Sequence, residues 1–242
     1  MNVEPRREWT LEQGAPIGPQ LYRILRERII GADLTPGSLI SESEVAKTYS
    51  LSRQPVREAF IKLAEDGLVE IRPQRGTLVR KISPAAVMDA RFVREAIEAD
   101  IVKLVAEEAD EALVKELTGQ LAIQRELPDN EADRFIALDE RFHRTLAEAA
   151  GKAYAWKMIE EVKAQMDRVR YLSALHFPKR ALVAQHTEIA EAIARRDAQA
   201  AEQAMRGHLR KILIDLPAIA EARPDFFETA DRTITINKEE TP

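Results

Sequence analysis

The chain of 242 residues contains no cysteine, few aromatic residues and no long apolar segment. Without cysteine it has neither a disulfide framework nor a thiolate metal site. No apolar run approaches the roughly 20 residues that cross a bilayer. The first ten residues, MNVEPRREWT, also lack the apolar core of a signal peptide. We therefore expect a cytoplasmic protein without a membrane partner.

Aromatic residues make up only 5% of the chain, whereas the apolar fraction of 45% is ordinary for a globular protein. Ala, Leu, Ile, Glu and Arg dominate the composition, and this bias favours helices. The length suits one large domain or two small ones. We therefore expect a mainly α protein with enough apolar residues to form a core.

The charge is distributed unevenly, although the net charge of -5 at first argues against binding to nucleic acid. Residues 1–82 contain 13 basic and 11 acidic residues, whereas the remainder contains 23 basic and 30 acidic ones. A basic segment attached to an acidic one suits local contact with phosphates. A chance fluctuation of a few charges would look the same, so charge alone decides little.

Residues 17–82 contain the pattern of a winged helix-turn-helix, preceded by a flexible polar segment at 1–16. A helix from Ile17 to Ile30 is followed by a turn and a short strand at 38–40. Ser41 and Glu44 form a capping box that begins a second helix. A third helix begins at Ser52, which we expect to cap it, and ends near Asp66, before Gly67. Two alternating segments, 68–71 and 77–79, then predict a hairpin, which would be the wing.

The third helix carries polar and basic residues at its N-terminal end, where a recognition helix contacts base edges. Arg can bind guanine O6 and N7, and Gln can bind adenine N6 and N7. The candidate DNA-binding residues on this helix are Ser52, Arg53, Gln54 and Arg57. The wing adds Arg72, Gln74, Arg75 and Gly76. The alternative is an ordinary amphipathic helix with a solvated basic face.

From Ser83 onward the pattern is almost entirely helical. The predicted helices cover about 84–108, 111–126, 130–150, 153–175, 178–195 and 198–215. Pro217 is expected to end the last helix, and a polar, loosely ordered tail is expected at 223–242. Helices of this length joined by short loops predict an antiparallel all-α bundle at 83–222.

Three predicted helices of the bundle each place a histidine on their apolar face. Asp139 and His143 are one turn apart, and His186 and His208 lie on the apolar stripes of two later helices. A buried Asp or His without a partner costs several kcal/mol. A divalent ion such as Zn, Ni or Mn would satisfy all four residues. The alternative is that each histidine is a hydrogen-bonded core residue or lies on a seam of the bundle.

The stretch PGSLISESEVAKTYSLSRQPVREAFIKLAEDGLVEIRPQRGTLV resembles the N-terminal domain of the GntR transcription regulators. The Pro-Gly turn, SRQPVREA and the LAEDGL…RGTLV wing carry the likeness. In that family, the residues at the positions of Arg53, Gln54 and Arg57 contact DNA. The resemblance also implies that the wing tip near Arg75 and Gly76 reaches the groove.

The second half resembles the FadR C-terminal ligand-binding domain of the metal-carrying kind, through VREAIEADIVKLVAEEA, FIALDERFHRTLAEAAG and QHTEIAEAIARRDAQAAEQAMRGHL. The resemblance implies that the metal ligands are Asp139, His143, His186 and His208. It also implies that Arg94 faces an effector pocket, whereas an exposed ion pair with Glu98 is an equal alternative. Arg168 and Arg170 are further candidates. Many relatives have Gly-Asn where this chain has Gly151-Lys152, so a pocket role for that Asn does not transfer.

Together these features predict a metabolite-responsive transcription regulator, most simply a repressor, that binds a pseudo-palindromic operator as a homodimer. Its helical domain would serve dimerisation and would sense a small organic acid beside the metal. We expect no catalytic residues. A metal-dependent enzyme using the Asp/His₃ site is one alternative, although it would not explain the winged segment. A regulator with a purely structural metal is the other.

Overall fold

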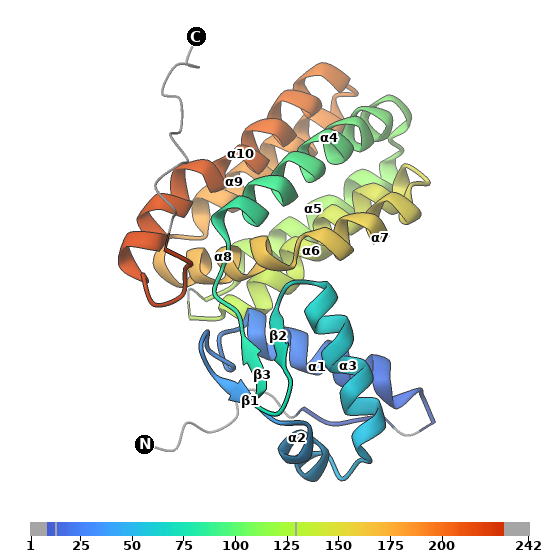
Figure 1. Cartoon of the computed structure of the whole chain (residues 1–242). Coiled ribbons are helices and arrows are strands. Elements are labelled where there is room, and N and C mark those ends of the chain that lie inside the picture. Colours follow the sequence, from blue (N-terminus) through green and yellow to red (C-terminus); the bar gives the residue numbers. More distant parts are fainter. Residues whose placement is uncertain (1–8, 13, 129, 230–242) are drawn as a thin grey trace.

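The computed structural model describes residues 9–12, 14–128 and 130–229. The polar segments expected at the two ends lie largely outside these residues. Figure 1 shows a helical bundle above a smaller unit that contains a three-stranded sheet. The elements of the smaller unit are α1 (Ile17–Ile30), β1 (Leu39–Ile40), α2 (Glu42–Thr48), α3 (Arg53–Glu65), β2 (Val69–Arg72) and β3 (Gly76–Val79). The elements of the bundle are α4 (Pro84–Glu108), α5 (Glu111–Glu126), α6 (Ala132–Ala149), α7 (Ala153–Val162), α8 (Ala164–His176), α9 (Arg180–Ala194) and α10 (Ala198–Ala222).

The smaller unit is the predicted winged helix-turn-helix. The side chain of Ser41 accepts a hydrogen bond from the Glu44 amide at 3.1 Å, as the capping pattern predicted. Gly67 has φ +69° where the chain leaves α3, a conformation that favours glycine. Ser52 occupies the N-cap position of α3, but its side chain makes no capping bond. The core of this unit comes from every helix and from the wing, and includes Leu25, Val45, Phe60, Leu68 and Val79.

The wing is an antiparallel sheet with the order β1-β3-β2. Val69 pairs with Val79, and Arg72 pairs with Gly76. The turn between β2 and β3 is closed by the Arg75 amide, which donates to the Arg72 carbonyl at 3.0 Å. Gly76 begins β3 with φ +85°. The turn chemistry therefore places the basic wing tip at the end of the hairpin.

The bundle packs α10 against α4 and α9, and α5 against α6 and α9. Asp110 caps α5 by accepting from the Leu113 amide at 2.8 Å, and Asp197 caps α10 by accepting from the Ala200 amide at 2.9 Å. One apolar cluster joins six helices through the residues Val102, Leu117, Phe142, Ile159, Ile189 and Leu209. No helix in the described part of the chain is long and apolar enough to cross a membrane.

Two helix boundaries in the bundle differ from the prediction. The helix expected at 153–175 is divided at Lys163, which is buried and pairs with Glu140 and Asp167. Pro217 does not end α10, which continues to Ala222. Pro217 is exposed, while Leu216 and Ile219 beside it are buried. Packing of that apolar face therefore holds the helix despite the lost backbone hydrogen bond.

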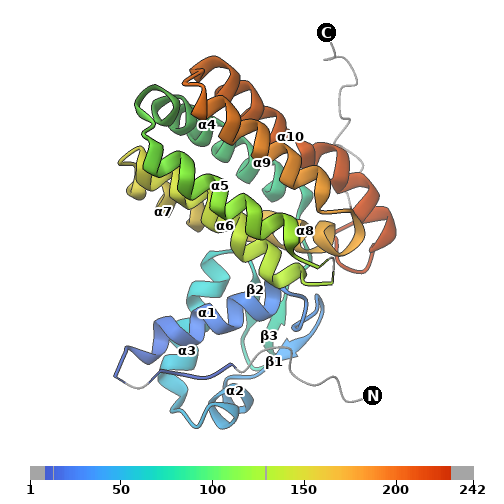
Figure 2. The same ribbon diagram turned by 180° about the vertical axis from the view of Figure 1, so that it is seen from behind.

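The segment after α10 returns to the junction between the two units. Phe226 and Phe227 are buried, and the Ile82 amide donates to the Phe226 carbonyl at 2.8 Å. The expectation of a loosely ordered tail from residue 223 is therefore wrong for these residues. Their apolar rings pack with Ile82 and Val87. The two units also meet through contacts between α1 and α8. Both views show α1 in the smaller unit, directly beneath the bundle (Figures 1 and 2).

Candidate functional site

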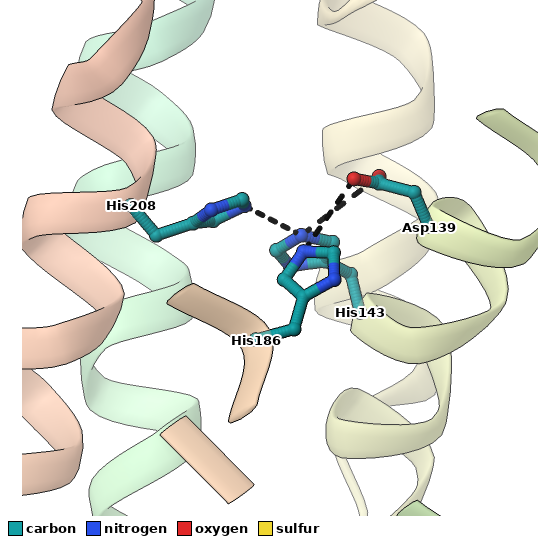
Figure 3. Close-up of side chains that lie close together, drawn as sticks. All are labelled: Asp139, His143, His186 and His208. Atoms are coloured by element: carbon teal, nitrogen blue, oxygen red, sulfur yellow. Dashed lines mark hydrogen bonds and ion pairs between the residues drawn. The ribbon is translucent and has the colours of Figure 1, made fainter. Parts of the chain in front are cut away.

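The structure brings together the four polar residues that the helical pattern singled out. Asp139 and His143 come from α6, His186 from α9 and His208 from α10. Each is buried, and each offers a nitrogen or oxygen atom within 4.8 Å of those of the other three. Figure 3 shows the three imidazoles and the carboxylate pointing toward a common centre. We call these residues the Asp/His₃ cluster.

Each imidazole of the cluster is held at its Nδ1 atom by an oxygen of a neighbouring side chain. The pairs are His143 with Glu98 at 2.5 Å, His186 with Gln124 at 2.9 Å and His208 with Gln185 at 3.2 Å. These oxygens accept the Nδ1 proton, so each neutral ring keeps its lone pair at Nε2. The lone pairs on the three Nε2 atoms are therefore available to coordinate a cation.

With the three protons on Nδ1, the geometry at the Nε2 atoms favours a cation between them. The Nε2 atoms of His143 and His208 lie 3.1 Å apart. The Nε2 atom of His186 lies 3.5 Å from Asp139 and has no hydrogen-bond partner among the described residues. Two lone pairs that face each other at such a distance repel, and a buried acceptor without a donor is unfavourable.

The electrostatic environment keeps these rings neutral. Burial lowers the pKa of His186 and of His208 well below the ordinary value, and neighbouring imidazoles lower it further. Burial also lowers the pKa of His143, although the Glu98 carboxylate opposes that shift. Three neutral imidazoles and one carboxylate are a ligand set for a divalent first-row ion. The residues present therefore fit a metal site.

A small cavity of about 40 Å³ adjoins the cluster on the side of α8 and α10. Arg94 lines it with Asp139 and His208. The Nε atom of Arg94 donates to Glu98 at 2.6 Å, and its Nη2 atom has no hydrogen-bond partner among the described residues. The pair with Glu98 that the sequence suggested is thus present, but it is buried rather than solvated. Arg94 leaves a free buried donor beside the cluster.

The other two candidate arginines have different positions. Arg170 lines the cavity and forms an ion pair with Asp139, and burial, with a smaller contribution from Arg94, lowers its pKa to about 9. Arg168 is absent from the cavity lining. Its Nη1 atom donates to Gln165 at 3.2 Å, and burial lowers its pKa to about 10. The positions therefore favour Arg94 and Arg170 over Arg168 as effector contacts.

Sequence reasoning missed the side chains that orient the imidazoles. Gln124 and Gln185 were not considered, and Glu98 was considered only as the partner of Arg94. Glu98 lies one and two turns before Val102 and Val105 on the buried face of α4, and Gln185 directly precedes His186. Inward spacing could have found Glu98. The same spacing could have found Gln124, which lies one and two turns after Leu121 and Leu117 on the buried face of α5, although it does not identify His186 as the partner.

The candidate DNA-binding residues lie on the exposed side of the winged unit. Ser52, Arg53, Gln54 and Arg57 are all exposed at the N-terminal end of α3. Gln54 donates to Glu58 at 3.0 Å, and Arg57 pairs with Glu42 at 3.4 Å. Such exposed pairs are weak, so both side chains are available to another partner.

The wing presents a second basic group. Arg75 is exposed at the turn, next to Gly76. Arg72 is half-buried and pairs with Glu70 at 3.0 Å. Val56 and Phe60, by contrast, face the core and hold α3 in place. Helix α3 therefore turns its basic residues outward and its apolar residues inward.

Two family models match the chain. The model described as "Bacterial regulatory proteins, gntR family" matches residues 18–79. The model described as "FCD domain" matches residues 89–211, which include all four residues of the Asp/His₃ cluster. The two matches divide the chain as the structure does, into the winged unit and the bundle.

Individual proteins agree with these models. The HTH-type transcriptional repressor RspR of Escherichia coli (strain K12) is 42% identical over 222 residues, which cover 91% of this chain and 97% of that protein. E. coli McbR/YncC has a TM-score of 0.71 at 17% identity, covering 84% of this chain and 99% of that chain. A putative transcriptional regulator GntR from Rhodococcus sp. RHA1 has a TM-score of 0.69 at 24% identity, covering 83% of this chain and 98% of that chain. The two structures establish the fold.

Proposed function

This chain belongs to the GntR family of bacterial regulatory proteins with an FCD domain, and we propose that it is a metabolite-responsive repressor. Like its relatives, it is a DNA-binding transcriptional regulator and not an enzyme. We assign DNA binding to residues 17–82. We assign effector binding and dimerisation to residues 83–222. Repression is proposed because the relative RspR is named a repressor.

One observation carries the proposal of sensing: three neutral imidazoles and Asp139 converge beside a cavity that Arg94 and Arg170 line. A purely structural site needs no such cationic neighbour. When bound, a divalent ion would supply a Lewis-acidic centre that attracts an anionic oxygen. The two guanidinium groups suit the same ligand, because Arg binds carboxylates through paired hydrogen bonds. We therefore propose a small organic acid as the effector.

We propose that the DNA target is a pseudo-palindrome bound by a homodimer. A recognition helix reads only a few base pairs, so two copies are needed to read two half-sites about one helical turn apart. Arg53, Gln54 and Arg57 would contact base edges, with Ser52 beside them. Arg72, Arg75 and Gly76 would contact the backbone or minor groove. An effector changes this binding only if its affinity differs between two arrangements of the winged units.

The proposal is tested first without knowledge of the operator or effector. Duplexes that the full-length protein retains are selected from a random library, and binding is compared with scrambled DNA at a fixed salt concentration. Metal content is measured before and after dialysis against a chelator. A panel of small carboxylates is then screened by thermal shift on the metal-loaded protein, because a ligand of the folded state raises the melting temperature.

The expected result is a selected palindromic motif, near-stoichiometric metal and a carboxylate that changes DNA affinity. Absence of any sequence preference would refute the DNA-binding part. If the chelator removes the metal, DNA affinity stays the same and no carboxylate changes it, the sensing part is wrong and the metal is structural. The two parts therefore fail by different measurements.

A further inference from the structure

Helix α8 belongs to the bundle by sequence, but its first residues are part of the winged unit. Ala164 is buried in the apolar core of that unit. Gln165 donates through Nε2 to the Gly67 carbonyl at 2.7 Å. Gly67 is where the chain leaves the recognition helix α3. One end of α8 therefore contacts the C-terminal end of the helix that is expected to read DNA.

The next turn of α8 faces the Asp/His₃ cluster through a series of ion pairs. Arg170 pairs with Asp139 of the cluster and, through Nη1, with Asp167 at 3.1 Å. Asp167 pairs in turn with Arg26 of α1 at 3.0 Å. Charges alternate along this series from the cluster to the winged unit. The side chains of Asp139 and Asp167 are only 3% exposed, and those of Arg170 and Arg26 are 12% and 17% exposed.

Asp167 is shared between the two units of the protein. Its Oδ1 atom accepts from Arg170, whereas its Oδ2 atom accepts from Lys163 at 2.7 Å and from Arg26. Of these three cations, only Arg26 belongs to the winged unit. In a buried site, charged hydrogen bonds are strong and depend on one another. When the ion pair between Arg170 and Asp167 becomes stronger, the ion pair between Asp167 and Arg26 therefore becomes weaker.

The series continues inside the winged unit. Arg26 also faces the hydroxyl of Tyr22, one turn earlier on α1. That hydroxyl donates to Asp66 at 2.5 Å. Asp66 is the C-cap residue of α3. The ion pairs and the contact from Gln165 thus reach adjacent residues at the same end of the recognition helix.

We propose that Asp167 is the coupling residue through which the effector cavity controls how tightly the winged unit packs against the bundle. This inference rests on the proposed function, because it names how the sensing site acts on DNA binding. An anionic effector in the cavity draws the Arg170 guanidinium away from Asp167. The Asp167 carboxylate then pairs more fully with Arg26 and Lys163, which tightens the contact between α8 and α1. Removing this carboxylate separates sensing from DNA binding.

A double-mutant cycle tests the coupling without metal or effector. Asp139→Asn frees Arg170 to pair with Asp167 alone, so Arg26 is held less tightly. Hydrogen exchange of peptides covering α1 should then become faster by about twofold or more. Twofold corresponds to the lower end of the interaction energies found between residues of one ion-pair network. In an Asp167→Asn background, Asp139→Asn should change α1 exchange no further. All variants are full-length and are measured in chelator, with affinity for the selected duplex as a second reading.

Glu131→Gln is the matched control, because Glu131 pairs with Arg134 at 3.2 Å on the bundle and neither side chain pairs with a member of this series. Its effect should add to that of Asp167→Asn. If Asp139→Asn leaves α1 exchange unchanged, or acts equally in both backgrounds, Asp167 is not the coupling residue. Should Asp167→Asn fail to fold, Arg26→Gln breaks the same series at the unit boundary. Because the cycle uses no ligand, its outcome stands even if the metal or effector assignment is wrong.

Discussion

Replacing His186 with alanine should abolish the stabilisation of the protein by a divalent ion. The ring of His186 is fully buried, stacks on Phe142 with ring centroids 4.6 Å apart and is oriented by Gln124. Its Nε2 atom faces Asp139. His186→Ala removes one of four ligands and leaves a void that contains no donor for a metal. His186 belongs to α9 of the bundle and is not part of the core of the winged unit, so that unit should remain folded.

The size of the effect follows from mass action. An ion at about 100 times its Kd stabilises a folded protein by about 2.7 kcal/mol. For a protein of this size, each kcal/mol raises the melting temperature by about 2–4 °C. The wild-type protein should therefore melt about 5–10 °C higher with the ion than in chelator. In the metal-free state, His186→Ala removes an unpartnered acceptor but also loses packing, so the informative quantity is the metal-dependent shift.

The assay is thermal unfolding of chelator-treated protein with and without Zn²⁺, supported by elemental analysis. His176→Ala is the matched control, because this fourth histidine of the chain bonds through Nδ1 to the Leu172 carbonyl, outside the cluster. The control should keep the full shift, and His186→Ala should lose it together with the bound metal. An unchanged shift and unchanged metal content in His186→Ala would show that His186 is not a ligand.

Three further predictions follow from the same contacts. Gln124→Ala should weaken metal binding about 10–100-fold, because the His186 ring loses the acceptor that orients it; equal affinity in a metal titration would contradict this role. Arg53→Ala and Arg57→Ala should each cost about 1–3 kcal/mol on the selected duplex and much less on random DNA; equal losses on both would exclude base readout. Burial raises the pKa of Asp167, but Lys163 and Arg26 outweigh burial and hold this pKa below its ordinary value. Its ionised form therefore stabilises the fold above about pH 4, the pKa of an unfolded Asp, and this contribution is lost as the pH falls. The difference in urea midpoint between wild type and Asp167→Asn should accordingly shrink below that pH; a difference that does not depend on pH would contradict it.

The winged unit could be predicted because its signals are local. A capping serine, a glycine after the recognition helix and a Pro-to-Gly turn each act within a few residues, and the structure shows Ser41, Gly67 and the wing turn in these roles. The cluster residues could be found because inward spacing at Asp139, His143 and His186 follows the helical repeat. Local pattern and packing agree at these positions, as they do in stable folds.

The features that escaped prediction depend on contacts between distant segments. Lys163 divides α7 from α8 although neither Gly nor Pro is present, and its ammonium group pairs with Glu140 and Asp167. Pro217 stays within α10 because apolar packing outweighs a local breaker. Gln124 binds His186 from a helix about 60 residues away. No periodicity within one helix contains information of this kind.

The charges of the winged unit are used in two different ways, which net charge does not reveal. Arg26 contributes to the basic balance of residues 1–82, yet its guanidinium faces inward to Asp167 and is mostly buried. Arg53, Arg57 and Arg75 are exposed and make at most weak contacts. Salt in solution strongly screens the charges of the exposed arginines, and it screens the buried ion pair between Arg26 and Asp167 much less. Affinity for DNA should therefore depend on salt through the recognition helix and wing, whereas the contact between α1 and α8 should persist at salt concentrations that release the DNA.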